Sequence, residues 1–274
     1  ANKYEEGDVL LVDNQSLDLV KNLGNIEDPK IDELISLHLY HEEIRLQKPL
    51  EVDAVMNDEN ERVDLTHLPF CTIDPNSAKD HDDAIYYDEE EKVLYVAIAD
   101  VSYFVKEGSA LDRLAFLKST SVYLPGKVLP MLPNELSEDM CSLKEGVNRY
   151  SFVFKIYLDL QKKVAKKAQL FEAIINSHKK FSYGRIDRVL QGHLDQYSSV
   201  EKTIFDYLLP LYEVTKSFRA KRLEKGYDFR TTELRQKLKN FKVVAVESES
   251  STPSHQLIEE CMLLANIEAS KKVN

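Results

Sequence analysis

The sequence predicts an α+β fold, and two observations lead to this prediction. Residues 151–160 alternate apolar and polar side chains, which is the pattern of a half-buried strand. Residues 199–225 instead carry apolar side chains at the spacing of a helix. The 274 residues are 43% hydrophobic and 30% charged, without repeats or low-complexity segments. This composition is ordinary for a globular domain and excludes disordered and collagen-like chains.

Before Arg62, the sequence predicts a short strand, a helix and a linker. Glu6–Asp13 is expected to form a short strand, which looks like the last strand of a domain whose beginning is missing. A helix is expected after Asp28 and Pro29, because Asp28 can cap it and Pro29 suits its first turn. Residues 48–64 are polar and rich in turn formers, which is typical of a linker. Since no Met opens the chain, we expect a fragment of a longer protein.

From Arg62 onward, strands dominate first and helices follow. The expected strands are residues 70–73, 84–87, 93–99, 151–160 and 164–176. The expected helices are residues 111–119, 182–191, 199–225 and 254–270.

The charge of the chain is unevenly distributed. The net charge is −11, and residues 1–64 hold 6 Lys and Arg against 17 Asp and Glu, so the remainder is neutral overall. An acidic balance argues against nucleic acid as a partner. Residues 216–242 weaken that argument, because they carry ten basic side chains and three acidic ones. A solvated helix face and a nucleic-acid contact both stay open for this basic cluster.

The cysteines and the apolar segments indicate the cellular compartment of the protein. Cys71, Cys141 and Cys261 lie far apart and form no C-x-x-C pair, which gives no support to a zinc or redox motif. A reducing, cytoplasmic location fits them best. No run of about 18 apolar residues occurs, so no membrane span is expected, and Ala1–Glu6 is too polar to begin a signal peptide.

The sharpest feature is a cluster of four aspartates within ten residues, on a predicted loop between two hydrophobic strands. They are Asp74, Asp80, Asp82 and Asp83. Two carboxylates ~4 Å apart repel each other by roughly 4 kcal/mol at an effective dielectric constant of about 20. A folded protein tolerates this with solvent, protonation or a cation, and carboxylate oxygens suit Mg²⁺. One or two such ions can activate water and stabilise the leaving oxygen of a phosphodiester.

A calcium site and an exposed acidic turn are the alternatives to a magnesium site at these aspartates. Calcium is disfavoured, because the spacing fits an EF-hand loop from neither Asp74 nor Asp80. An exposed acidic turn is the usual meaning of an isolated Asp-x-Asp-Asp. The hydrophobic strands on both sides and the motifs that follow favour the magnesium site.

Together with the aspartates, several motifs resemble the catalytic domain of the ribonuclease II and ribonuclease R family. The first runs from Arg62 through Leu68-Pro69-Phe70 and Thr72-Ile73-Asp74-Pro75 to Asp82-Asp83-Ala84. The others follow in the family's order: Ile98-Ala99-Asp100-Val101-Ser102, Thr120-Ser121-Val122-Tyr123-Leu124-Pro125-Gly126, Pro130-Met131-Leu132-Pro133, Cys141-Ser142-Leu143 and Leu257-Ile258-Glu259-Glu260. The resemblance covers about residues 62–274.

The resemblance implies an incomplete RNB-type catalytic domain at residues 62–274, with a mixed sheet flanked by helices. It implies that residues 1–15 are the last strand of a cold-shock, OB-like barrel, and that residues 16–61 form a helix and a linker. The implied activity is Mg²⁺-dependent hydrolysis of RNA from a single-stranded 3′ end, releasing nucleoside 5′-monophosphates, with Mn²⁺ as the alternative ion. A monomer is expected.

The resemblance also implies roles for individual residues. Asp74, Asp80, Asp82 and Asp83 correspond to the metal-binding and catalytic carboxylates. Among them, Asp74 and Asp83 are expected closest to the ion and Asp82 most involved in the chemistry. His81, between them, stands where the family usually has an apolar residue. It is interpreted as a substitute of similar bulk, with a pH-sensitive neighbour as the alternative.

Three further residues correspond to RNA contacts of the family. Tyr123 matches an aromatic ring that stacks on a terminal base, and stacking is worth about 1–3 kcal/mol per base. Tyr183 matches a residue near the substrate ribose. Glu260, or its neighbour Glu259, matches another sugar contact, and such groups can recognise the 2′-hydroxyl of RNA.

The family's later Ser-Pro-Ile-Arg-Arg-Tyr-like stretch, whose arginine contacts the scissile phosphate, does not occur in these 274 residues. We therefore expect this chain alone to be a weak or inactive nuclease, with the remaining portion of the enzyme as its partner. Two alternatives stay open. One is a non-catalytic RNA-binding module of the same fold, and the other is a regulatory or scaffold fragment based on the acidic N-terminal stretch.

Overall fold

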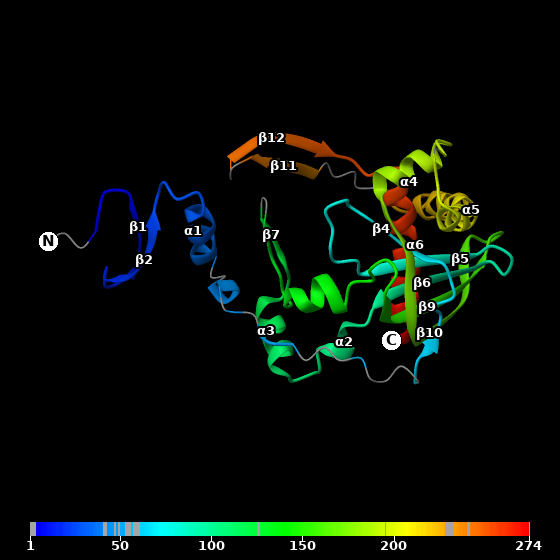
Figure 1. The fold of residues 1–274 in the computed structure, drawn as a ribbon, viewed down its shortest axis with the longest axis horizontal. Helices are drawn as coiled ribbons and strands as arrows, with labels where there is room; N and C mark the ends of the chain where they lie inside the picture. The colour runs from blue at the N-terminus through cyan, green and yellow to red at the C-terminus, as the bar shows by residue number, and fades with distance from the viewer. Residues whose placement is uncertain are drawn as a thin grey trace. The chain divides into compact units, whose positions relative to one another are not determined.

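The structure is a computed structural model of the 274-residue chain (Figure 1). It describes residues 4–40, 43–46, 48, 50–52, 56, 61–124, 127–194, 196–227, 233–239 and 242–273. The chain divides into two compact units. Unit 1 comprises residues 1–50, 108–132 and 233–249, and unit 2 comprises residues 51–107, 133–232 and 250–274.

Unit 2 is built on a mixed sheet of six strands in the order β3-β10-β4-β5-β6-β9. The strands are β3 (Val63–Asp64), β4 (Phe70–Asp74), β5 (Asp83–Asp88), β6 (Val93–Ala99), β9 (Asn148–Asp159) and β10 (Val164–Ser182). β10 runs parallel to β3 and β4, and the other neighbours are antiparallel. Because β9 pairs with β10 as well as with β6, the strand order returns on itself.

The length of β10 makes this closure possible. Its 19 residues pair first with β9, over 164–176, and then with β4, over 177–182. The last residue of the strand, Ser182, lies opposite Asp74 at the end of β4. The strand therefore connects the far hairpin of the sheet to the residues expected to form the active site.

Three helices of unit 2 lie together beside its sheet in Figure 1: α4 (Tyr183–Leu190), α5 (Ser199–Leu223) and α6 (Pro253–Val273). α5 begins with a capping box, in which Ser198 and Glu201 satisfy each other's backbone N–H groups. Buried side chains from these helices, such as Leu208 and Leu257, form one apolar core with Ile85 of the sheet. The remaining helical segments are α2 (Val101–Phe104) and the π-helical turn η3 (Leu136–Met140).

A buried ion pair fixes the start of unit 2. Arg62 Nη2 donates to Asp100 Oδ2 at 2.8 Å, and both side chains are only 2% exposed. The guanidinium carbon lies 4.1 Å from the centroid of the Tyr150 ring. Asp100 also caps α2 by accepting from the Tyr103 N–H at 3.0 Å. The pair therefore joins segments that are far apart in the sequence.

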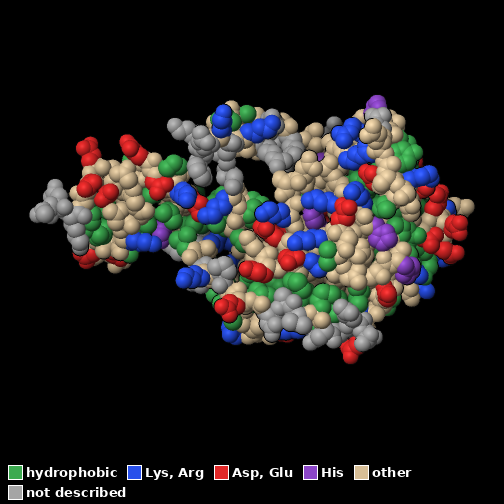
Figure 2. Space-filling model, in the orientation of Figure 1, with side chains coloured by type: hydrophobic (Ala, Val, Ile, Leu, Met, Phe, Trp, Pro, Cys, Tyr) green, Lys and Arg blue, Asp and Glu red, His purple; other side chains and the backbone are tan. Residues whose placement is uncertain are grey.

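Unit 1 contains short elements: β1 (Asp8–Val12), β2 (Leu19–Asn25), α1 (Ile31–Leu39), η1 (Glu43–Leu46), α3 (Ala110–Lys118), β7 (Val122–Leu124), β8 (Lys127–Leu129), β11 (Glu233–Lys239) and β12 (Lys242–Glu249). The strands form three antiparallel pairs, β1–β2, β7–β8 and β11–β12. Arg45 joins the N-terminal segment to the end of α3 by donating to the carbonyls of Lys118 and Thr120, at 2.8 and 2.7 Å. Figure 2 shows acidic side chains over β1 and β2 and basic ones over β11 and β12.

The predicted α+β class with a mixed sheet is confirmed, and the strands and helices expected from residue 70 onward are present. β2 lies within residues 16–61, where the sequence predicted only a helix and a linker, and the strands of β7–β8 and β11–β12 were not predicted. The helix expected after Pro29 is α1, but its N-cap is Lys30. Asp28 instead accepts a hydrogen bond from the Lys30 N–H at 2.9 Å. Residues 53–55 and 57–60 of the expected linker lie outside the described residues.

Within the described residues, no helix combines the length and the apolar character needed to cross a bilayer.

Replacing Arg62 by Met should lower the free energy of unfolding by about 3–5 kcal/mol, because Asp100 would stay buried without its cationic partner. Urea denaturation followed by circular dichroism measures the loss. The control is Lys202→Met, which removes an exposed pair with Asp206 and should cost at most ~1 kcal/mol. Similar losses in both variants would contradict a structural role for the buried pair.

Candidate active site

The loop between β4 and β5 carries the four aspartates. Asp74 ends β4, Asp83 begins β5, and Asp80 and Asp82 lie between them. Because Cys71 of β4 pairs with Ile85 of β5, both ends of the loop are held by the same sheet. Asp82 is exposed, whereas the other three are partly buried.

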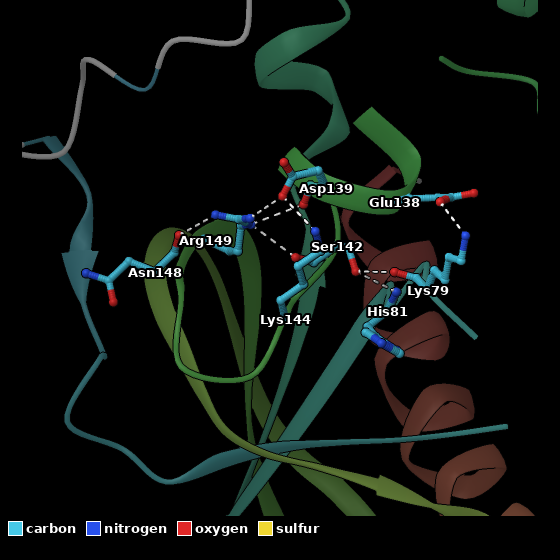
Figure 3. Close-up of polar contacts among 8 residues, drawn as sticks. All are labelled: Lys79, His81, Glu138, Asp139, Ser142, Lys144, Asn148 and Arg149. Atoms are coloured by element: carbon cyan, nitrogen blue, oxygen red, sulfur yellow. Dashed lines mark hydrogen bonds and ion pairs between the residues drawn. The ribbon is translucent and has the colours of Figure 1, made fainter. Parts of the chain in front are cut away.

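Ser142 anchors the middle of this loop (Figure 3). Its hydroxyl donates to the carbonyl of Lys79 at 2.7 Å and accepts from the backbone N–H of His81 at 3.0 Å. The next residue, Leu143, donates its N–H to the carbonyl of His81 at 2.8 Å. The backbone of His81 is therefore held at both its N–H and its C=O.

The segment that carries Ser142 is itself fixed by Arg149 and η3. Arg149 Nη2 donates to Asp139 Oδ1 at 2.8 Å, and its Nε donates to the carbonyl of Ser142 at 3.1 Å (Figure 3). Lys79 also reaches Glu138 of η3, with 3.2 Å between Nζ and Oε2. Because π-helical turns are frequent at functional sites, η3 beside the aspartate loop is consistent with a site there.

The sheet anchors the loop on its other sides. Ala99 of β6 donates its N–H to the carbonyl of Asp82 at 2.9 Å. Lys180 of β10 donates from Nζ to the carbonyl of Ala78 at 2.7 Å. Hydrogen bonds from three different segments therefore hold the backbone of the aspartate loop in place.

The aspartates act on one another electrostatically. Burial, and then the charges of Asp74 and Asp82, raise the pKa of Asp83 to about 7. Partial desolvation, and then the charges of Asp80 and Asp74, raise the pKa of Asp82 above its usual value. His81 opposes both shifts. The repulsion predicted from the sequence is therefore present between the aspartates of the folded loop.

His81 contacts Asp74 directly. The imidazole is 5% exposed, and its Nδ1 lies 2.8 Å from Asp74 Oδ2. Since a carboxylate only accepts, Nδ1 carries the hydrogen of this bond. The sequence interpretation of His81 as a substitute of similar bulk therefore misses a specific contact within the aspartate cluster.

Tyr183 lies next to the aspartates, because it follows Ser182 and Ser182 is opposite Asp74. Burial, and then the charges of Asp74 and Asp83, raise the pKa of Tyr183 to about 12, so its phenol is protonated at neutral pH. The ring stacks on His255 of α6, with centroids 3.7 Å apart and planes at 15°. The structure thus places Tyr183 next to the aspartates, and its contact with a ribose stays a prediction.

Glu260 is buried in a network with α5. It is 4% exposed, and its carboxylate accepts from Arg219 Nη1 at 3.1 Å and from Arg222 Nε at 3.3 Å. Glu259 is the more exposed of the two acids and accepts from Arg219 at 3.0 Å. Two arginines of the basic cluster 216–242 are therefore paired with α6, which the sequence did not predict.

Tyr123 belongs to β7 of unit 1 and is 69% exposed. Its exposed ring is in keeping with a stacking surface, and stacking on a base stays a prediction. The Pro125-Gly126 turn that the sequence placed beside it lies outside the described residues.

The donor set of the loop fits a hard divalent cation by its chemistry. All four predicted ligands are carboxylates, the ligand type that Mg²⁺ prefers. After burial, the charges of neighbouring aspartates raise the pKa values of Asp82 and Asp83, and a bound cation would oppose this effect. Within the described part of the chain, however, no three Asp, Glu, His or Cys side chains already converge as a metal site.

Sequence reasoning missed three residues that organise the site. They are Ser142, Lys180 and His255, and each contacts a segment distant in the sequence. Cys141-Ser142-Leu143 was noted as a motif, which is the one signal that pointed to Ser142. Nothing in local periodicity marks Lys180 or His255.

Comparisons with known families agree with this geometry. Residues 62–274 match the RNB domain family, and residues 1–37 match the second OB domain of ribonuclease R. Ribonuclease R of Helicobacter pylori (strain ATCC 700392 / 26695) is 38% identical over 265 residues. That alignment covers 94% of this chain and 40% of the relative, so the chain spans well under half of the relative's length.

Solved structures lead to the same family. RNase R of Mycoplasma genitalium in complex with double-stranded RNA has a TM-score of 0.83 at 27% identity, covering 97% of this chain and 50% of that one. Its complex with ribose-methylated single-stranded RNA has a TM-score of 0.77 at 29% identity, covering 91% and 40%. Yeast Ssd1, a pseudonuclease, shares the fold at 20% identity, with a TM-score of 0.64 and coverage of 88% and 31%.

Without a divalent cation, Asp83→Asn should raise the melting temperature near pH 7.5 and change it little near pH 4. The folded carboxyl has a pKa of about 7 against 3.8 for an unperturbed aspartate. As the pH rises between these values, the unfolded chain loses this proton first, so the carboxyl lowers stability progressively. Asn cannot ionise and avoids that loss.

Thermal denaturation in EDTA at several pH values between 4 and 8 measures this difference. The control is Asp206→Asn on the exposed face of α5. A stability difference for Asp83→Asn that stays constant across this range would contradict the expected ionisation.

Proposed function

Since the chain belongs to the RNB domain family, we propose that it is the catalytic part of a hydrolytic 3′→5′ exoribonuclease. In this proposal, RNA enters by a single-stranded 3′ end and is released as nucleoside 5′-monophosphates. The observation that carries the proposal is the group of four carboxylates on one anchored loop, in which burial and then the charges of neighbouring aspartates raise the pKa values of Asp82 and Asp83. In an ordinary solvent-exposed acidic turn, by contrast, the carboxylates can move apart and stay hydrated.

Asp74, Asp80, Asp82 and Asp83 hold Mg²⁺, with Mn²⁺ as a substitute. When bound, the ion supplies the positive charge that activates water and stabilises the leaving oxygen of the phosphodiester. Asp82 is assigned to the chemistry because it is the exposed member of the cluster.

The sugar and the base of the terminal nucleotide are recognised by other side chains. Tyr183 keeps its phenolic hydrogen at neutral pH and donates a hydrogen bond to a ribose 2′-hydroxyl, the group that distinguishes RNA from DNA. Glu260, or the more exposed Glu259, accepts from a sugar hydroxyl. Tyr123 stacks on a base without reading its sequence.

The 274-residue chain alone is expected to hydrolyse RNA slowly or not at all. The stretch whose arginine contacts the scissile phosphate in this family does not occur in the sequence. A positively charged donor aimed at developing charge is often worth ~3 kcal/mol or more. Full activity then requires the remaining portion of the protein, which we propose acts as a monomer. The free thiols of Cys71, Cys141 and Cys261 fit a cytoplasmic site of action.

A non-catalytic RNA-binding module is the second candidate, and the fold shared with the pseudonuclease Ssd1 favours it. The four aspartates in this chain favour catalysis instead. A 3′-tailed RNA incubated with the longer protein and Mg²⁺ distinguishes the two. Mononucleotides that appear with Mg²⁺ and disappear with EDTA support the exonuclease. Tight RNA binding without any product supports the module.

In the longer protein, Asp82→Asn should abolish release of mononucleotides, because it removes the carboxylate assigned to the hydrolysis step. RNA affinity should stay nearly unchanged, because Asp82 is not one of the proposed RNA-contacting side chains. Product analysis and fluorescence anisotropy measure the two quantities. Asp159→Asn, at the distant end of β9, is the control and should retain turnover. Turnover by Asp82→Asn at the rate of the original protein would overturn the assignment of Asp82.

Tyr123→Ala should weaken binding of a single-stranded 3′ end by about 1–3 kcal/mol, whereas Tyr123→Phe keeps the ring and should bind almost normally. Anisotropy titrations in EDTA measure both affinities without hydrolysis. Equal affinities for the Ala and Phe variants would show that the ring of Tyr123 does not stack on RNA.

A further inference from the structure

His81 is the one imidazole within residues 74–83, and it contacts an aspartate of the same loop. It is 4% exposed, so the protein rather than solvent determines where its ring lies. A buried polar ring is retained at little cost only where its hydrogen bonds are made. Nδ1 makes such a bond to Asp74, over 2.8 Å.

The position of the ring is set by backbone contacts on both sides of His81. Ser142 Oγ accepts from its N–H, and Leu143 donates to its carbonyl. Ser142 is fully buried and is itself held through Arg149 (Figure 3). The donor that faces Asp74 is therefore attached to a rigid part of the structure.

A fixed donor selects one orientation of a carboxylate. The terminal torsion of an aspartate is broad, so the group turns easily when nothing holds it. With Oδ2 bound to His81, Asp74 keeps Oδ1 for another ligand. The bond needs only the Nδ1 hydrogen, which a neutral imidazole supplies.

We propose that His81 is a positioning residue, which orients the Asp74 carboxylate so that Oδ1 binds the divalent cation. This inference rests on the proposed function, since it assumes that Asp74 is a metal ligand. Hydrogen-bond partners that orient a metal ligand typically contribute 10–100-fold to metal affinity. Loss of the Nδ1 donor should therefore weaken the metal site without removing any of its ligands.

Mn²⁺ binding to the full 274-residue chain tests this inference, with free Mn²⁺ measured by electron paramagnetic resonance after EDTA treatment and desalting. His81→Phe should lower Mn²⁺ affinity by about 10–100-fold. His81→Asn should restore most of it, because the Asn amide nitrogen lies close to the place of Nδ1. The Gln side chain is one methylene longer, so its amide nitrogen does not take the place of Nδ1. His81→Gln should therefore bind Mn²⁺ as weakly as His81→Phe does.

The Asn and Gln variants keep the test valid if the Phe variant fails to fold, because both carry the same functional group. Thermal denaturation of each variant identifies those that are folded. Asn and Gln variants that bind Mn²⁺ as tightly as the original chain would overturn the inference, and so would equal weakening in both.

Asp74→Asn separates this inference from the metal site itself. If Asp74→Asn binds Mn²⁺ as well as the original chain, the metal site of the proposed function fails, and the role of His81 with it. If Asp74→Asn loses Mn²⁺ while His81→Gln keeps it, only the role of His81 fails. Loss in Asp74→Asn and His81→Gln, with recovery in His81→Asn, supports both.

Discussion

Repulsion between the carboxylates of the β4–β5 loop is the constraint on which the structure around that loop depends. Asp74, Asp80, Asp82 and Asp83 would separate if the loop were mobile, since separation lowers their mutual energy. The Ser142 hydroxyl, the Lys180 ammonium and the Ala99 N–H oppose this separation by donating to backbone carbonyls of the loop. The fold thus keeps four aspartates on one short loop. Neighbouring side chains neutralise their negative charge only in part, so the loop attracts a cation.

Much of this arrangement could be predicted from sequence, because its signals are local. The strands on each side of the aspartates show continuous β-forming residues, and the aspartates stand together in the chain. The long helices from residue 183 onward have clear periodicity, and α5 starts with a capping box visible in the sequence as Ser198 and Glu201. The α+β class and the position of the candidate site follow from these signals.

The parts that could not be predicted depend on contacts between distant segments. Glu260 is hydrogen-bonded to Arg219 and Arg222, about 40 residues earlier in the chain, and no local sequence pattern reveals this pairing. The hairpin β11–β12 has exposed apolar residues on a basic background, so it lacks the alternation of a half-buried strand. His81 could be identified as unusual, but its bond to Asp74 depends on a turn that brings residues seven apart together.

The fold by itself leaves the chemistry open, because a pseudonuclease shares it. The proposed chemistry depends on the side chains of the β4–β5 loop and on the hydrogen bonds that hold its backbone. The position of Tyr183 depends on the same scaffold, through the register of Ser182 with Asp74. The proposed metal and sugar contacts thus lie on elements of unit 2 that pack with one sheet, whereas Tyr123, the proposed base contact, belongs to unit 1.

The double pairing of β10 also limits how this chain can change in length during evolution. One residue deleted between 164 and 182 would turn every later side chain of the strand to the opposite face and shift Ser182 away from Asp74. The turn at residues 160–163 lies at the opposite end of the strand, where an extra residue disturbs neither partner. Insertions and deletions among descendants of this sequence should therefore accumulate at that turn and be purged from the strand.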